Sequence, residues 1–156
     1  MTGFIPPKVW LAPMSGCTDA AMRAAAARFG ATGLVSEMVA GDALLENCID
    51  MTTRTCRHDG AGAWIVQLAA RRPEDMYAGT QALVKLGVEV VDINFGCPAR
   101  RVTGGQGGSA LMKDEPLAVE IMAAAMEGAE GTPVTVKMRL GWDDVSLNAP
   151  VLAGEA

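Results

Sequence analysis

The sequence has 156 residues, half of them apolar and 20% charged, and its net charge at pH 7 is −5. This composition suits one hydrophobic core and argues against disorder. Surfaces that bind phosphate are normally basic, so the acidic balance argues against a segment that grips nucleic acid by itself. The start of the chain lacks the basic and apolar regions of a signal peptide, and no stretch nears the roughly 18 apolar residues of a membrane span. We therefore expect a cytoplasmic protein with no membrane partner.

The cysteines and the single histidine restrict the chemistry further. Cysteines stand at positions 17, 48, 56 and 97, without a Cys-x-x-Cys pair, and His58 is the only histidine. Structural zinc needs four clustered Cys or His ligands, so we expect no metal site. A Ser-His-Asp or Cys-His mechanism is also disfavoured, because His58 would have to be its base.

Short runs rich in β-branched residues alternate along the chain with alanine-rich stretches. The runs are almost continuously apolar, which is typical of strands buried on both faces of a sheet. They predict five strands, at residues 9–13, 33–37, 64–68, 88–94 and 134–138.

The segment after the first strand predicts a helix. Thr18 or Asp19 can cap its start, and the glycine that follows Phe29 can end it. Met22, Ala26 and Phe29 would then share one apolar face.

Helices are also predicted between the later strands. Residues 41–51 read as helical, and residues 54–63 read as a loop. Pro73 opens a helix before the fourth strand, and Asp114 caps another before the fifth. A further helical pattern begins at residues 147–156.

Alternating strands and helices predict an α/β fold with a parallel sheet covered by helices. An open doubly wound sheet and a (β/α)8 TIM barrel both fit. The open sheet favours a Gly-x-Gly-x-x-Gly turn after its first strand, which residues 13–19 (PMSGCTD) lack. A complete barrel takes about 250 residues. We therefore expect a TIM barrel truncated to about its first five strands, with an unusual short sheet as the alternative. The open edges of either sheet favour self-association.

Polar or conformationally special residues follow every predicted strand. In TIM barrels the chemistry takes place at the C-terminal ends of the strands, so we expect these residues to meet. Lys137 is a charge in an apolar strand, and burial would require an anionic or electron-rich ligand, or Glu37, to compensate it. Cys97 lies in a tight turn between Gly96 and Pro98. The strand-end residues are Pro13, Met14, Ser15, Ser36, Glu37, Gln67, Asn94, Cys97, Lys137 and Arg139.

Several segments match one known family, in order and over nearly the whole chain. They are APMSGCTD (12–19), SEM (36–38), VQLAARRP (66–73), DINFGCPARRV (92–102), GGSALM (107–112) and PVTVKMRLGWDD (133–144). The chain thus resembles the N-terminal part of a tRNA-dihydrouridine synthase. The resemblance implies that residues 1–156 are the N-terminal portion of an FMN-binding TIM-barrel catalytic domain, and that the family's C-terminal helical tRNA-binding domain is absent.

The resemblance also implies an activity, which is the reduction of uridine to 5,6-dihydrouridine in tRNA by FMN that NADPH reloads. Cys97 matches the family's proton donor to uracil C5, a role that suits a thiol because an ordinary thiol is mostly protonated at pH 7. The glycines of residues 104–108 would allow a mobile loop to close over the uridine. By position, Pro13, Met14, Ser15, Gln67 and Lys137 would bind FMN, and Asn94, Arg139 and Arg101 would lie in the flavin or substrate pocket.

Two alternatives stay open. One is a truncated and catalytically inactive fragment of such an enzyme, because the last barrel strands, whose turns hold the FMN phosphate in such barrels, are not present. The other is an FMN barrel that acts on a free pyrimidine. One departure from the family pattern is Arg101, where lysine is usual; an arginine keeps the charge but changes its geometry.

Overall fold

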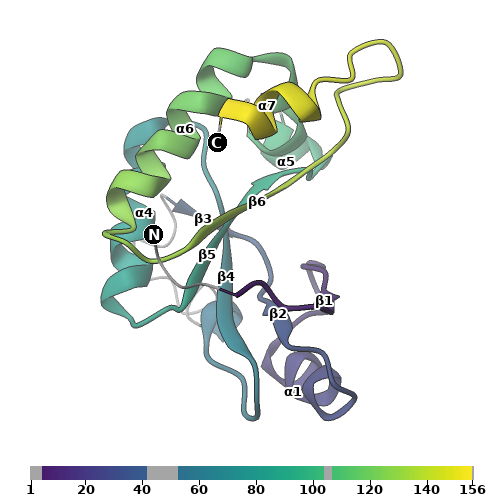
Figure 1. Cartoon of the computed structure of the whole chain (residues 1–156), viewed down its shortest axis with the longest axis vertical. Helices are drawn as coiled ribbons and strands as arrows, with labels where there is room; N and C mark the ends of the chain where they lie inside the picture. The colour runs from purple at the N-terminus through teal and green to yellow at the C-terminus, as the bar shows by residue number, and fades with distance from the viewer. Residues whose placement is uncertain (1–4, 42–52, 104–106, 156) are drawn as a thin grey trace.

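The structure is a computed structural model that describes residues 5–41, 53–103 and 107–155, and only the backbone of Arg101 and Thr103. Within these residues the chain forms a parallel sheet in the order β1-β2-β4-β5-β6, and β3 also pairs with β4. The sheet curls, and most of the helices lie on one side of it (Figure 1). This arrangement confirms the predicted α/β fold class. The fold is that of a TIM barrel, of which this chain supplies the first five strands.

The strands follow the five predicted runs. The second strand ends earlier than predicted: β2 pairs with the start of β4, and a short strand that was not predicted, β3, pairs with the end of β4. The amide of Ser36 continues the ladder by donating to the carbonyl of Ile65 at 2.9 Å. The strands are β1 (Trp10–Leu11), β2 (Gly33–Val35), β3 (Val39–Ala40), β4 (Ala63–Ala69), β5 (Val90–Phe95) and β6 (Val134–Met138).

The helices begin where the capping residues predict. The Asp19 carboxylate accepts from the amide of Met22, and the Asp114 carboxylate accepts from the amide of Leu117. The helices are α1 (Ala20–Arg28), α4 (Pro73–Lys85), α5 (Arg100–Thr103), the 3-10 helix η1 (Gly108–Lys113), α6 (Glu115–Gly128) and α7 (Ala149–Glu155).

Two predictions between the second and third strands have different outcomes. The helix predicted at residues 41–51 lies almost wholly outside the described residues. The loop predicted at 54–63 starts within a helical turn at residues 53–55 and is then irregular up to β4.

The main hydrophobic core lies between the sheet and the helix pair α4 and α6. Val91, Ile93 and Phe95 of β5 point into it, together with Val66 and Leu68 of β4. On the helical side the core is completed by Met76, Leu83, Ile121, Met122 and Ala125. Because strand side chains alternate between faces, the residues between these positions point to the concave face of the sheet.

The apolar face predicted for α1 is wrong. Met22 is 42% exposed and Phe29 is 93% exposed, whereas Arg23 is fully buried. The Arg23 guanidinium donates to the carbonyls of Thr18 and Cys56, at 3.2 and 2.8 Å. These bonds to neighbouring loops orient α1, and they explain why a cation occupies the side that packs against the sheet.

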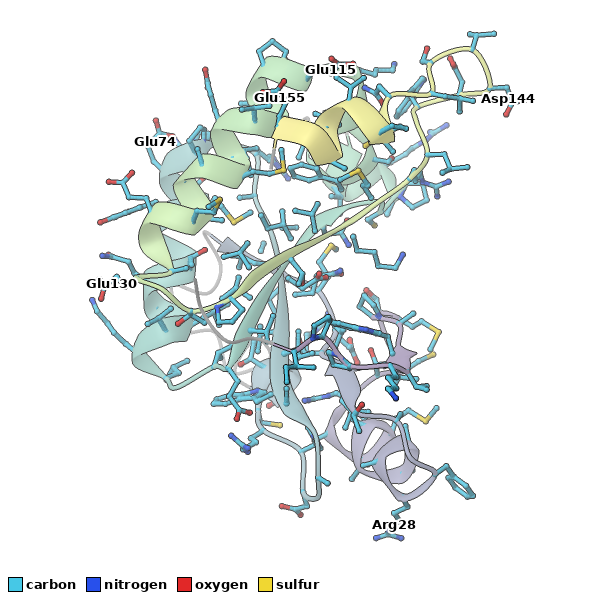
Figure 2. The ribbon with its side chains drawn as sticks, viewed as in Figure 1. Arg28, Glu74, Glu115, Glu130, Asp144 and Glu155 are labelled. Carbon is cyan, nitrogen blue, oxygen red and sulfur yellow. The ribbon has the colours of Figure 1, made fainter. Side chains whose placement is uncertain are left out.

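The acidic side chains labelled in Figure 2 lie away from the concave face. Glu74 and Glu130 project from the outer side of the α4–α6 layer, and Asp144 lies at the tip of the loop after β6. These contributions to the negative net charge therefore lie outside the concave face. No helix among the described residues is long and apolar enough to cross a membrane.

Candidate functional site

The concave face of the sheet carries a row of polar side chains that cross three strands. Strand register places Gln67 of β4 beside Asp92 of β5, and Asp92 beside Thr135 of β6. One step further along, Asn94 lies beside Lys137. Gln67, Asp92 and Asn94 are all buried. The row runs from the middle of the sheet to the C-terminal ends of the strands, which is where TIM barrels carry their chemistry.

Hydrogen bonds join this row into one relay. Thr135 Oγ1 donates to Asp92 Oδ1, and Gln67 Nε2 donates to Asp92 Oδ2, both at 2.7 Å. Asn94 Nδ2 then donates to Gln67 Oε1, also at 2.7 Å. The Gln67 backbone amide donates to Ser36 Oγ at 3.2 Å, which links β2 to the same group. We refer to Thr135, Asp92, Gln67 and Asn94 as the polar relay.

The polar relay ends on the turn that carries Cys97. Asn94 Oδ1 accepts from the backbone amides of Gly96 and Cys97, at 3.1 and 2.9 Å. Arg139 Nε donates to the carbonyl of Gly96 at 2.9 Å, and the amide of Ser109 donates to the carbonyl of Cys97 at 3.0 Å. The turn is thus held from β5, from β6 and from η1, with Cys97 only partly buried.

Glycine at position 108 is required by the close approach of η1 to this turn. Gly108 has φ of +60°, and a Cβ there would lie 2.7 Å from the carbonyl oxygen of Cys97. Gly107 and Gly108 are both buried. Packing and the positive φ therefore require glycine at position 108, whereas a Cβ at Gly107 would meet ordinary contacts at 3.4 Å. Closure of this loop over a substrate stays a prediction. Residues 104–106, which include the other two glycines, lie outside the described residues.

A cavity of about 310 Å³ lies on the concave face between the β1 and β6 edges of the sheet. Its size is at the low end for ligand pockets, which span roughly 300–1,000 Å³. Its walls combine apolar side chains with a carboxylate, a hydroxyl and an ammonium group. The lining residues are Trp10, Leu11, Ala12, Pro13, Val35, Asp92, Thr135, Val136 and Lys137.

Among the described titratable groups that line this cavity, Asp92 has the pKa that departs most from its usual value. Burial raises its pKa from 3.8 to about 6, because the charged form loses its hydration. The hydrogen bonds from Thr135 and Gln67 and the positive charge of Lys137 oppose that rise. At neutral pH Asp92 is therefore ionised but poorly solvated.

Lys137, the charge in an otherwise apolar strand, needs no buried partner in this structure. Its side chain is exposed, because β6 is an edge strand in the described sheet. Glu37 does not compensate it: the Glu37 carboxylate accepts from the amide of Gly16 at 3.0 Å and lies 3.6 Å from Arg54 Nη1. Among the described residues Lys137 has no ion-pair partner, so its charge is available to a ligand of the cavity.

The three residues expected to bind flavin after β1 occupy different positions. Pro13 lines the cavity. Met14 and Ser15 are exposed and are not part of its lining. The Met14 amide donates to Thr18 Oγ1 at 3.0 Å, and its carbonyl accepts from the amides of Cys17 and Thr18. Contacts of Met14 and Ser15 with a ligand stay a prediction.

The structure connects the remaining candidate residues less directly to the cavity. Arg139 is exposed and reaches the Cys97 turn through the bond described above. Arg101 lies in α5, and its side chain is outside the described residues. His58 precedes β4, at the end of the sheet opposite to Cys97, which leaves it far from the proposed chemistry. Among the described residues no group of three or more His, Cys, Asp or Glu side chains is arranged to hold a metal ion.

Asp92 and Thr135 are site residues that the sequence analysis missed. The available signal was a carboxylate inside the apolar run VEVVDIN (88–94), where an ionisable residue is costly unless it has partners. Thr135 offers no comparable signal, because threonine is common in strands.

Comparison with known proteins gives a consistent result. The family of dihydrouridine synthases (Dus) matches residues 10–154. A probable tRNA-dihydrouridine synthase of Rickettsia conorii is 47% identical over 144 residues, which cover 92% of this chain and 43% of the relative. One of Rhodobacter capsulatus is 43% identical over 153 residues, 97% of this chain and 47% of the relative. The tRNA-dihydrouridine synthase B of Pseudomonas aeruginosa is 40% identical over 150 residues, 96% of this chain and 45% of the relative.

The chain spans about half the length of the curated relatives it matches. The matched residues include both edges of the cavity, the polar relay and the Cys97 turn. The chain therefore belongs to the dihydrouridine synthase family.

Proposed function

We propose that this protein reduces uridine in tRNA to 5,6-dihydrouridine, with FMN as the bound cofactor and NADPH as the reductant. Family membership and the names of the relatives support the reaction. The single observation that carries the proposal for this chain is the position of the Cys97 turn. The polar relay connects it to Gln67 and to the wall of the cavity.

The cavity suits a flat, largely apolar ring with polar edges. Trp10, Leu11 and Val35 provide apolar walls, while Lys137 provides a positive charge without a described counter-ion. An electron-rich ring gains from such a charge, which is one way in which proteins tune flavins. We propose that Pro13, Gln67 and Lys137 hold the ring, with Met14 and Ser15 beside it. FMN, once bound, supplies the hydride to C6 of the uracil.

Cys97 has the chemical role of donating a proton to C5 of the uracil ring. The hydride adds electron density to C5 and the C4 carbonyl, and an acid on the opposite face completes the reduction. A rigid turn favours this role, because an acid must lie within hydrogen-bonding reach of the carbon it protonates. The bonds from Asn94, Arg139 and Ser109 supply that rigidity. Asn94 and Arg139 are proposed to contact the substrate or the flavin, and Arg101 joins them as a third pocket residue.

The tRNA is proposed as the partner, and its target base must leave the stack to reach the cavity. The acidic groups on the outer helices do not favour phosphate, so we assign docking mainly to regions other than the α4–α6 layer.

The test is an assay of the purified natural full-length protein with FMN, NADPH and either unmodified tRNA or free uridine. We expect dihydrouridine to form in tRNA and only slowly from the free nucleoside. Equal turnover of free uridine would favour an enzyme of free pyrimidines. A protein that binds FMN but forms no dihydrouridine from either substrate would contradict the proposed reaction.

A further inference from the structure

Asp92 differs from the other members of the polar relay in one chemical respect. An ionised carboxylate can only accept hydrogen bonds, whereas an amide side chain can present either its oxygen or its nitrogen. Both Asp92 oxygens are occupied, one by Thr135 and one by Gln67, each at 2.7 Å. The carboxylate therefore requires Gln67 to turn its Nε2 toward β5.

This requirement passes along the relay. With Nε2 facing Asp92, Gln67 presents Oε1 to Asn94, which must then donate through Nδ2. Asn94 is left with Oδ1 facing the next turn, where it accepts from the amides of Gly96 and Cys97. Each amide has one orientation that satisfies both of its neighbours, and Asp92 at one end and the turn amides at the other impose the same one.

We propose that Asp92 is a positioning residue: it fixes the orientation of the Gln67 amide, supports through it the orientation of the Asn94 amide, and thereby helps to hold the turn that carries Cys97. Its importance for catalysis rests on the proposed function, in which Cys97 donates a proton and Gln67 holds the flavin ring.

Burial supports the proposal. Asp92 is 4% exposed, and a carboxylate in such a place destabilises the fold unless its partners compensate it. Among the described residues, the charged group that acts on Asp92 is Lys137 of β6, and its positive charge favours the ionised form of the Asp92 carboxyl. Burying an apolar residue of similar volume would cost less free energy. We therefore explain the carboxylate by the direction of hydrogen bonding that it imposes on the polar relay.

The first test replaces Asp92 with leucine in the isotopically labelled natural full-length protein. The substitution removes the acceptor, keeps most of the volume, and leaves the Gln67 and Thr135 donors without this partner. Without the acceptor, Gln67 is no longer oriented from β5, and Asn94 keeps only the amides of the turn as partners that orient it. We expect hydrogen exchange of the Gly96 and Cys97 amides to become at least about tenfold faster.

The matched control is Thr135→Val. It removes the other 2.7 Å bond of the same carboxylate and leaves the acceptor that orients Gln67. We expect exchange of the two turn amides to change by less than about twofold. Acceleration in Thr135→Val as large as in Asp92→Leu would show that any loss of packing loosens the turn, and would overturn the proposal.

The second test exchanges the two ends of the relay in the double variant Asp92→Asn/Asn94→Asp. The carboxylate now at position 94 still accepts from Gly96 and Cys97, so Gln67 must reverse. Its Nε2 then donates to that carboxylate, and its Oε1 accepts from the amide group now at position 92. Nuclear Overhauser contacts of the Gln67 side-chain amide protons should move from the β protons of position 92 to those of position 94. Unchanged contacts in the double variant, or unchanged exchange in Asp92→Leu, would overturn the proposal.

These measurements use neither flavin nor tRNA, so they are independent of turnover. A wild-type protein that forms no dihydrouridine would contradict the proposed function while the relay results still stand. An Asp92→Leu variant that loses turnover with unchanged exchange would contradict the positioning role alone.

Discussion

Replacing Asp92 with asparagine should remove a buried charge whose cost can be worked out from the structure. Burial raises the pKa of Asp92 from 3.8 to about 6. Each unit of pKa difference between the folded and unfolded states corresponds to about 1.36 kcal/mol of free energy. The ionised carboxylate therefore destabilises the folded state by about 3 kcal/mol, relative to its protonated form.

The direction of the pKa shift decides how the free energy of unfolding changes with pH. Because the folded pKa lies above the unfolded value, the folded state retains a proton that the unfolded state has released between about pH 4 and pH 6. Stability is complete below this interval and falls as the pH rises through about 6. Asparagine does not titrate, so Asp92→Asn should lack this fall.

The assay is chemical denaturation of both proteins from pH 3 to pH 8. We expect the free energy of unfolding of the wild type, minus that of Asp92→Asn, to fall by about 3 kcal/mol across the interval. Glu74→Gln on the outer side of α4 controls for the loss of one negative charge. A difference that stays constant within about 0.5 kcal/mol would refute the assignment of a poorly solvated carboxylate to Asp92.

Three further substitutions test other parts of the site. Lys137→Met should weaken FMN binding about tenfold or more, measured by titration of flavin absorbance, because it removes the positive charge that lines the cavity; unchanged affinity would exclude the contact. Gly108→Ala should lower the free energy of unfolding by about 2 kcal/mol or more, because the added methyl group would lie 2.7 Å from the Cys97 carbonyl oxygen and the φ of this residue is +60°. An unchanged free energy of unfolding would contradict the close packing of η1. Glu37→Gln should speed hydrogen exchange of the Gly16 amide about tenfold, because a charged acceptor is lost; unchanged exchange would show that this bond does not hold the segment after β1.

The strands were predictable because each is an almost uninterrupted apolar run, and their parallel arrangement follows from the helices between them. The caps at Asp19 and Asp114 were equally accessible, since capping is a local property of sequence. The meeting of Gln67 and Asn94 followed from their common place at strand ends.

The polar relay was not predictable, because it depends on the register of three strands. A shift of one residue in β5 would turn Asp92 toward the helices and break every bond of the relay. The exposure of Lys137 and the burial of Arg23 depend on which elements pack beside them, which residue spacing does not reveal.

The central claim is that the Cys97 thiol supplies the proton in a reaction carried out at this cavity. The most direct measurement is a single turnover of the natural full-length protein, with bound FMN first reduced by NADPH and then mixed with unmodified tRNA. The account predicts that Cys97→Ala is reduced by NADPH at the wild-type rate but forms dihydrouridine at least about a hundredfold more slowly, the typical contribution of a general acid. Dihydrouridine formation at the wild-type rate in Cys97→Ala would contradict it.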